Sequence, residues 1–220
     1  MKPASDAELF ALILDRLFTP VLGDILDRER RWHQFLPQPI KPLNPALRLL
    51  GRAFPVQIAT VAGPQSRPFG RLTEALDTLQ PGEVYLATGG AMNCAAWGEI
   101  MTATARTRGA AGAVIDGFHR DTPRVLEQNW PVFSRGSFAQ DAGVRSSVID
   151  FGCAVEIEGV LVEPGDLIFG DVDGVLVIPR SLESRVVEQA LDKVAGEKRV
   201  RGEIEAGSTS TAVFDRYGIL

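Results

Sequence analysis

The sequence contains few of the residues that most often carry metal or redox chemistry. Its 220 residues include two histidines, two cysteines and four lysines. The two cysteines, Cys94 and Cys153, match neither a zinc-binding spacing nor a CxxC redox pair. We therefore expect two free thiols in a reducing compartment.

Long apolar runs are also missing. Asp6, Glu8 and Asp15 interrupt the amino-terminal stretch, which therefore does not resemble a signal peptide. No apolar run approaches the ~20 residues that are needed to span a bilayer. The net charge of -5 argues weakly against a nucleic-acid-binding surface. We expect a cytoplasmic protein that binds neither membrane nor nucleic acid.

What is present is the composition of an ordinary globular protein. Hydrophobic residues make up 45% of the chain and charged residues 23%. A chain of this length can bury roughly 70% of the surface that its unfolded form exposes. Because no repeat or linker-like stretch divides the sequence, we expect a single domain over residues 1–220.

Hydrophobic spacing predicts helices towards both ends of the chain. Asp6–Leu17 has apolar residues at helical spacing, and a second helix is expected with Thr19 as N-cap and Pro20 in its first turn. Gln34–Pro45 contains several prolines, which predict an ordered extended connection. Further along, Ser181 is expected to cap a long amphipathic helix.

Strands and helices alternate through the middle of the chain. The expected strands are Gly51–Val61, Val84–Thr88, Ala113–Ile115 and Val132–Phe133, and the expected helices are Leu72–Leu79, Trp97–Arg108 and Thr122–Gln128. This alternation predicts an α/β fold with parallel strands covered by helices. A β-rich layer is expected over Val148–Pro179. The tail from Gly207 is expected to be irregular and to dock through Phe214, Tyr217 and Leu220.

The run DGFHRDTP, Asp116–Pro123, follows one of the buried strands. Polar residues just past the carboxyl end of a strand are where α/β proteins place ligands. If Thr122 caps the following helix, Arg120 and Asp121 remain available to a ligand. The alternative, which composition alone favours, is that Asp121 caps the helix and Arg120 is a solvated charge.

The run GGAMNCAAWGEIM leads from another strand into a helix. Its residues Gly98, Glu99, Ile100 and Met101 would form the first helical turn, whose free N–H groups can bind an anion such as a carboxylate. The alternative is a loop that only packs a strand against a helix. Because the run lacks GxGxxG, nothing supports a dinucleotide or S-adenosylmethionine site.

Two further features have weaker links to function. His119 has a near-neutral pKa that suits proton transfer or substrate contact, and the alternative is a place behind the site or on the surface. The acidic residues in the run Pro164–Pro179 are typical of β-turns and lack the spacing of a calcium loop.

Together these motifs resemble those of the RraA-like superfamily. Their order is WGE, AGAVIDGFHRD, PVFSRG and EPGDLIFGDVDGVLVIP, followed by a helix containing Glu197 and a YGIL tail, so the resemblance covers Thr19–Leu220. The family includes class II pyruvate aldolases that act on 4-hydroxy-4-methyl-2-oxoglutarate or 4-carboxy-4-hydroxy-2-oxoadipate, and the regulator of ribonuclease E activity. The resemblance implies a layered β/β/α fold like that of swivelling phosphohistidine domains, with amino-terminal helices and a carboxyl-terminal helix.

The resemblance also implies catalytic roles. Asp121 is expected to hold a divalent metal, magnesium or manganese. Arg120 is expected to contact the 2-oxo oxygen of a pyruvyl group, and Glu99 to work with a metal-bound water. Glu197 is expected to reach the site of a neighbouring subunit, in a homotrimer or in a hexamer built from trimers.

Substrate contacts follow from the same resemblance. The N–H groups of Ile100 and Met101, with Gly98 alongside, are expected to bind the carboxylate of a 2-oxo acid. Phe118 and His119 stand where many aldolases of the family have small apolar residues. We expect His119 to contact the substrate, and both residues to alter which distal group the site accepts.

The implied activity is cleavage of a 4-hydroxy-2-oxo acid to pyruvate and a carbonyl compound. Oxaloacetate decarboxylation passes through the same pyruvate enolate and is expected as a further activity. No Schiff-base lysine is required, and all the lysines lie outside the site motifs. The alternative is a non-enzymatic regulator that binds protein; the presence of Glu99, Asp121 and Glu197 favours the enzyme.

Overall fold

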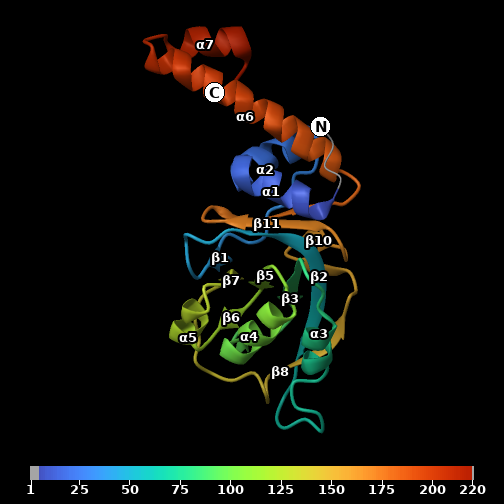
Figure 1. Ribbon diagram of the computed structural model, residues 1–220. Helices are drawn as coiled ribbons and strands as arrows, with labels where there is room; N and C mark the ends of the chain where they lie inside the picture. Colours follow the sequence, from blue (N-terminus) through green and yellow to red (C-terminus); the bar gives the residue numbers. More distant parts are fainter. Residues whose placement is uncertain (1–4, 220) are drawn as a thin grey trace.

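A mixed sheet runs through the protein and has helices on two of its outer sides (Figure 1). The computed structural model describes residues 5–219. The helices are α1 (Asp6–Arg16), α2 (Thr19–Arg28), α3 (Leu72–Thr78), α4 (Glu99–Thr107), α5 (Thr122–Glu127), α6 (Glu183–Glu205) and α7 (Ser210–Tyr217).

The strands form the large sheet and two short pairs. They are β1 (Lys41–Pro42), β2 (Leu49–Thr60), β3 (Glu83–Thr88), β4 (Ala95–Trp97), β5 (Gly112–Ile115), β6 (Phe118–His119), β7 (Val132–Ser134), β8 (Ser146–Phe151), β9 (Val155–Ile157), β10 (Val160–Val162), β11 (Leu167–Asp171) and β12 (Gly174–Ile178). The short pairs are the antiparallel β9–β10 and the parallel β4–β6.

The parallel part of the large sheet positions the site. Strands β2, β3, β5 and β7 lie side by side in that order and run in the same direction. On the other side of β2, strands β11 and β12 continue the sheet in antiparallel pairs. Strand β8 pairs with the second half of β2, with a register shift between Gln57 and Ile58.

The proline-rich connection nearly closes this sheet. Phe35 forms a bridge to Leu176 of β12, and β1 pairs with β7 at the opposite edge. The prediction of an ordered extended connection over Gln34–Pro45 is therefore confirmed. The nearly closed sheet surrounds an apolar core. Its buried residues include Ile40, Leu49, Leu86, Val114, Phe133 and Ile168.

Two further apolar layers attach the helices. Helices α3, α4 and α5 cover the parallel strands through a core that includes Tyr85, Trp97 and Trp130. Helices α1, α2 and α6 pack on β11 and β12 through a separate core. Figure 1 shows these two helical layers at opposite ends of the protein, with α6 extending outward and α7 at its tip.

The α/β fold and the order of its main helices and strands agree with the structure predicted from the sequence. Outside the site, the starts of α2 and α6 differ from that prediction. Phe18 is the N-cap of α2, because the Thr19 hydroxyl donates instead to Asp171 Oδ1 at 2.7 Å. Likewise α6 begins at Glu183 with no side-chain cap bond, so Ser181 does not cap it.

The tail contains a helix that the sequence analysis missed. Thr209 caps α7 by accepting from the Ala212 N–H, and Gly218 ends the helix in the left-handed region. The predicted docking is confirmed for Tyr217, whose hydroxyl donates to Glu203 of α6 at 2.5 Å. Phe214 is about half exposed and Leu220 lies outside the described residues. Between residues 5 and 219 no helix is long and apolar enough to cross a membrane.

Candidate active site

Two short parallel strands bring the predicted site residues together. Strands β4 and β6 pair with Trp97 opposite His119. The Arg120 N–H then donates to the Trp97 carbonyl at 2.9 Å. Because both strands end at the same edge, the segments Gly98–Glu99 and Arg120–Asp121 lie side by side.

A cavity of about 220 Å³ opens at this edge. Every residue predicted for the site lines it, except His119 and Glu197. The lining residues are Phe69, Leu72, Ala95, Ala96, Trp97, Gly98, Glu99, Ile100, Met101, Arg120, Asp121, Asp141 and Ala142.

Asp121 has an unusual backbone conformation. Its φ of 59° and ψ of 32° lie in the left-handed region, which is costly for a residue with a side chain and is often found at functional sites. Asp121 is also the N-cap of α5, which corrects the prediction that Thr122 would be. Its carboxylate nevertheless makes no cap bond to α5, and Oδ2 instead accepts from the Glu99 N–H at 3.3 Å.

Gly98 makes room for that carboxylate. A Cβ at position 98 would lie 2.7 Å from Asp121 Oδ2, closer than real Cβ atoms approach an oxygen. The backbone of Gly98 is extended, so the requirement for glycine comes from space and not from backbone conformation.

The first turn of α4 faces the cavity, as predicted. Gly98 is the N-cap and the helix begins at Glu99, whereas Trp97 belongs to β4 and not to the helix. The N–H groups of a first helical turn have no carbonyl four residues earlier to bind. The N–H groups of Ile100 and Met101, which both line the cavity, are therefore of the kind that can bind an anion. The Ile100 side chain is 79% exposed at its rim.

The guanidinium of Arg120 lies between two carboxylates. Its Nη1 is 3.0 Å from Asp141 Oδ1, and its Nε is 3.8 Å from Asp121 Oδ2. The side chain is 39% exposed, so it remains accessible to a ligand. Arg120 is the one cationic residue in the cavity wall among residues 5–219.

Asp141 was missed by the sequence analysis. It lies between β7 and β8, where its Oδ2 accepts from the Gly143 N–H at 2.8 Å. The Ala95 N–H donates to the Gln140 carbonyl at 2.8 Å, which holds this segment against β4. No motif marks Asp141, and the only signal was its place after the end of a parallel strand.

His119 lies behind the site and not in the cavity wall. It is buried, with Nδ1 2.8 Å from the Ser134 hydroxyl and Nε2 3.0 Å from the Thr122 hydroxyl. Burial lowers the pKa of His119 below its usual value, which favours the neutral ring. Its contacts link the start of α5 to the end of β7.

Glu197 lies far from the cavity of its own chain. It forms an ion pair with Lys193, one turn earlier in α6, at 3.3 Å. Helix α6 packs on the β11–β12 side, whereas α4 covers the parallel strands (Figure 1). If Glu197 contacts such a cavity, the cavity must therefore belong to another copy of the chain.

The sequence matches a known family over most of its length. The profile of the RraA-like family, described as Aldolase/RraA, matches residues 19–177. The chain belongs to the RraA-like family. A protein of Halalkalibacterium halodurans named "Putative 4-hydroxy-4-methyl-2-oxoglutarate aldolase" is 34% identical over 160 residues, covering 72% of this chain and 73% of that protein. Protein DlpA of Legionella pneumophila is 30% identical over 179 residues, or 81% of this chain, which spans 29% of the length of DlpA.

Solved structures share the RraA-like fold. A protein from Pseudomonas syringae pv. tomato superimposes with a TM-score of 0.85 at 31% identity, covering 98% of this chain and 96% of that one. RraAS2 of Streptomyces coelicolor, described as an unusual member of the RNase ES inhibitor RraA family, has a TM-score of 0.79 at 26% identity, covering 91% and 99%. The implied fold is thereby confirmed.

The carboxylates of this RraA-like site suit only certain metals. The described part of the chain has no group of three or more His, Cys, Asp or Glu side chains that could hold an ion. Asp121 can offer one carboxylate to an ion, because its closest approach to the Arg120 guanidinium is 3.8 Å, whereas Asp141 is already paired with Arg120 at 3.0 Å. Magnesium and similar hard cations keep several waters and need few protein ligands. The donor set fits such a hydrated ion and does not fit a fully protein-ligated one.

We expect Gly98→Ala to displace the Asp121 carboxylate, because the new methyl group would meet it at 2.7 Å. The carboxylate oxygen that it meets ends a flexible side chain that is 42% exposed, so the carboxylate can swing aside. The free energy of unfolding, measured by urea denaturation, should therefore fall by less than about 1 kcal/mol, and the crystal structure of the variant should show the carboxylate displaced.

Gly202→Ala is the matched control for this change. A Cβ at position 202 meets nothing within 4 Å, and alanine is the better helix former. This variant should be unchanged or slightly more stable. A crystal structure of Gly98→Ala in which the Asp121 carboxylate has not moved would contradict the steric argument.

Proposed function

We propose that this chain is a divalent-metal-dependent carbon–carbon lyase that cleaves a 4-hydroxy-2-oxo acid to pyruvate and a carbonyl compound. One observation carries the proposal: the Arg120 guanidinium, the Asp121 carboxylate and the first turn of α4 share one small cavity. The relatives named as aldolases support the same reaction class.

The proposed substrate is bound by its 2-oxo acid end. Its carboxylate accepts from the N–H groups of Ile100 and Met101, where the α4 dipole also favours negative charge. Its 2-oxo oxygen accepts from Arg120, whose guanidinium supplies directional donors and a permanent charge.

Cleavage breaks the bond between C3 and C4 of the substrate. Glu99 accepts the proton of the C4 hydroxyl, C4 becomes the carbonyl carbon of one product, and the electron pair of the broken bond forms a pyruvate enolate. Arg120 stabilises the charge that develops on the enolate oxygen. Return of a proton to C3 then gives pyruvate.

Asp121 would hold the divalent metal, magnesium or manganese. When bound, the metal supplies Lewis-acid stabilisation of the enolate. The left-handed backbone of Asp121 and the missing side chain at Gly98 keep the carboxylate beside Arg120.

A Schiff-base route has no support in the cavity. Its described wall contains no lysine. Lys193 of α6 forms ion pairs with Asp24 of α2 and with Glu197 of α6. Lys41 donates to the Asp173 carbonyl. Neither amine is placed to attack a substrate in this site.

A second candidate is a non-enzymatic regulator that binds another protein. The structural similarity to RraAS2, described within an RNase inhibitor family, favours it. That function requires neither a metal nor turnover of a 2-oxo acid, so the assay below separates the two candidates.

We predict that the protein decarboxylates oxaloacetate faster than free magnesium does, because that reaction also forms the pyruvate enolate. Excess EDTA should abolish this activity, and borohydride should trap no substrate on the protein. Arg120→Lys should lower kcat/KM by about tenfold or more, since a point charge cannot reproduce the guanidinium fork.

Arg124→Lys is the control, because Arg124 is exposed on α5 and pairs with Glu127 outside the cavity. Pyruvate formation from oxaloacetate is followed in each case. Full activity in EDTA, or an unchanged rate in Arg120→Lys, would contradict the proposed chemistry.

We further propose that a neighbouring subunit completes the site in a trimer or in a hexamer of trimers. Glu197 cannot reach the cavity of its own chain, and the exposed Ile100 leaves an apolar rim around that cavity. In a head-to-tail ring each cavity would receive α6 from one neighbour.

Under this arrangement Glu197→Ala should lower turnover and leave the fold intact. Glu188→Ala, on the same helix, should leave turnover unchanged. Mixed under subunit exchange with Asp121→Ala, the Glu197→Ala protein should regain up to about a quarter of wild-type activity. That is the fraction of shared sites in which both residues are intact after random mixing in a ring.

Turnover measured after exchange, with mixing verified by native mass spectrometry, provides the test. A monomer by light scattering, or proven exchange without recovery, would rule out the shared site.

A further inference from the structure

Resting on the proposed function, we propose that the substrate is a 4-hydroxy-2-oxo acid with a single carboxylate and a small apolar group at C4. We also propose that Asp141 selects against a second carboxylate at that end. The carbonyl product would then be a short aldehyde or ketone and not a second 2-oxo acid.

The cavity wall contains more negative than positive charge. Arg120 is its single cation in the described chain, against the three carboxylates of Glu99, Asp121 and Asp141. The pyruvyl end of the substrate needs Arg120, whose Nη1 already lies 3.0 Å from Asp141. The metal that Asp121 would hold would serve the same pyruvyl end. No positive side chain of this chain is then left in the described wall for a second substrate carboxylate.

The remaining wall is apolar. Its residues are Phe69, Leu72, Ala95, Ala96, Trp97, Ile100, Met101 and Ala142. Once the carboxylate and the 2-oxo oxygen occupy the α4 terminus and Arg120, the C4 substituent faces these side chains and Asp141. The volume of about 220 Å³ lies below the range of about 300–1,000 Å³ typical of drug-sized ligands, so the substituent must be small.

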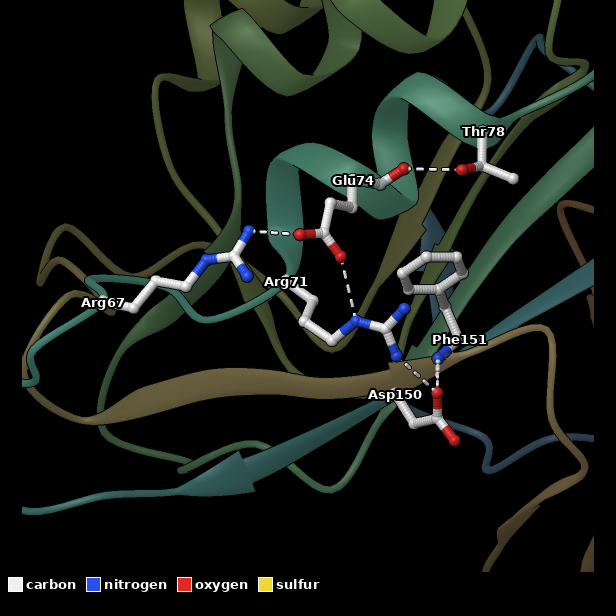
Figure 2. Close-up of polar contacts among 6 residues, drawn as sticks. All are labelled: Arg67, Arg71, Glu74, Thr78, Asp150 and Phe151. Atoms are coloured by element: carbon white, nitrogen blue, oxygen red, sulfur yellow. Dashed lines mark hydrogen bonds and ion pairs between the residues drawn. The ribbon is translucent and has the colours of Figure 1, made fainter.

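The arginines nearest to this apolar wall in the sequence bind other partners. Figure 2 shows Glu74 between Arg67 and Arg71, 2.5 Å and 3.0 Å from their guanidinium nitrogens. Arg71 also lies 2.9 Å from Asp150 Oδ1, and its guanidinium stacks on the Phe151 ring. Both cations flank Phe69 in the chain, yet neither lines the cavity.

A third arginine is near but also engaged. Arg145 Nη1 donates to the backbone carbonyl of Asp141 at 3.0 Å and does not line the cavity. It therefore holds the segment that carries Asp141, whose carboxylate forms its ion pair with Arg120. A carboxylate on C4 would meet that group across a small, partly enclosed space, where like charges repel. Specificity built on such repulsion does not require any tighter contact with the favoured substrate.

The test uses two substrates that differ only at C5. 4-Hydroxy-4-methyl-2-oxopentanoate has a methyl group where 4-hydroxy-4-methyl-2-oxoglutarate has a carboxylate. Pyruvate release with magnesium gives kcat/KM for each, counting two pyruvates per turnover for the diacid. Because both acids share the pyruvyl end, any effect on Arg120 cancels in the ratio of the two values.

We expect the wild type to favour the monocarboxylate. Asp141→Asn should shift the ratio towards the diacid by about tenfold. The amide oxygen can still accept from the Gly143 N–H, so the local turn should persist. Phe69→Arg should shift the ratio in the same direction by adding a cation to an exposed position in the wall, whereas Phe69→Gln should not.

The outcomes separate this inference from the function on which it rests. A wild type that prefers the diacid, or a ratio that neither Asp141→Asn nor Phe69→Arg changes, would overturn the inference and leave the lyase intact. Absence of pyruvate release from both acids would overturn the proposed function and this inference with it.

Discussion

The pairing of β4 with β6 is the contact on which the candidate site depends. Each strand is only two or three residues long, yet together they place the amino terminus of α4 beside the Arg120–Asp121 pair. The missing side chain of Gly98 lets the Asp121 carboxylate approach the first turn of α4. A small backbone contact thus joins two motifs that lie about twenty residues apart in the sequence.

The electrostatics of the cavity follow from this arrangement. One guanidinium, one helix terminus and three carboxylates surround a cavity of about 220 Å³. The positive groups gather where a 2-oxo acid would bind, and Asp141 lies on the other side of Arg120. The same residues that would stabilise an enolate therefore leave little positive charge for the rest of the substrate, which links the proposed chemistry to the proposed selectivity.

Much of the fold could be predicted because its central strands and helices have strong hydrophobic periodicity. The helix starts were harder, because tertiary contacts decided them: Thr19 binds Asp171 and does not cap α2. At the site, sequence reasoning found the residues on the two strand ends and not Asp141, since no local pattern marks a loop residue that pairs with Arg120. It also could not show that both ring nitrogens of His119 lie within hydrogen-bond distance of hydroxyl groups.

The central claim is that this cavity stabilises the enolate of pyruvate, and it can be tested without knowing the natural substrate. Exchange of the pyruvate methyl protons for solvent deuterium, followed by proton NMR, reports enolate formation directly. The account predicts that the exchange rate with protein and magnesium is well above the rate with magnesium alone. Excess EDTA should abolish this exchange, and Arg120→Lys should greatly reduce its rate. Exchange no faster than in the protein-free control would contradict it.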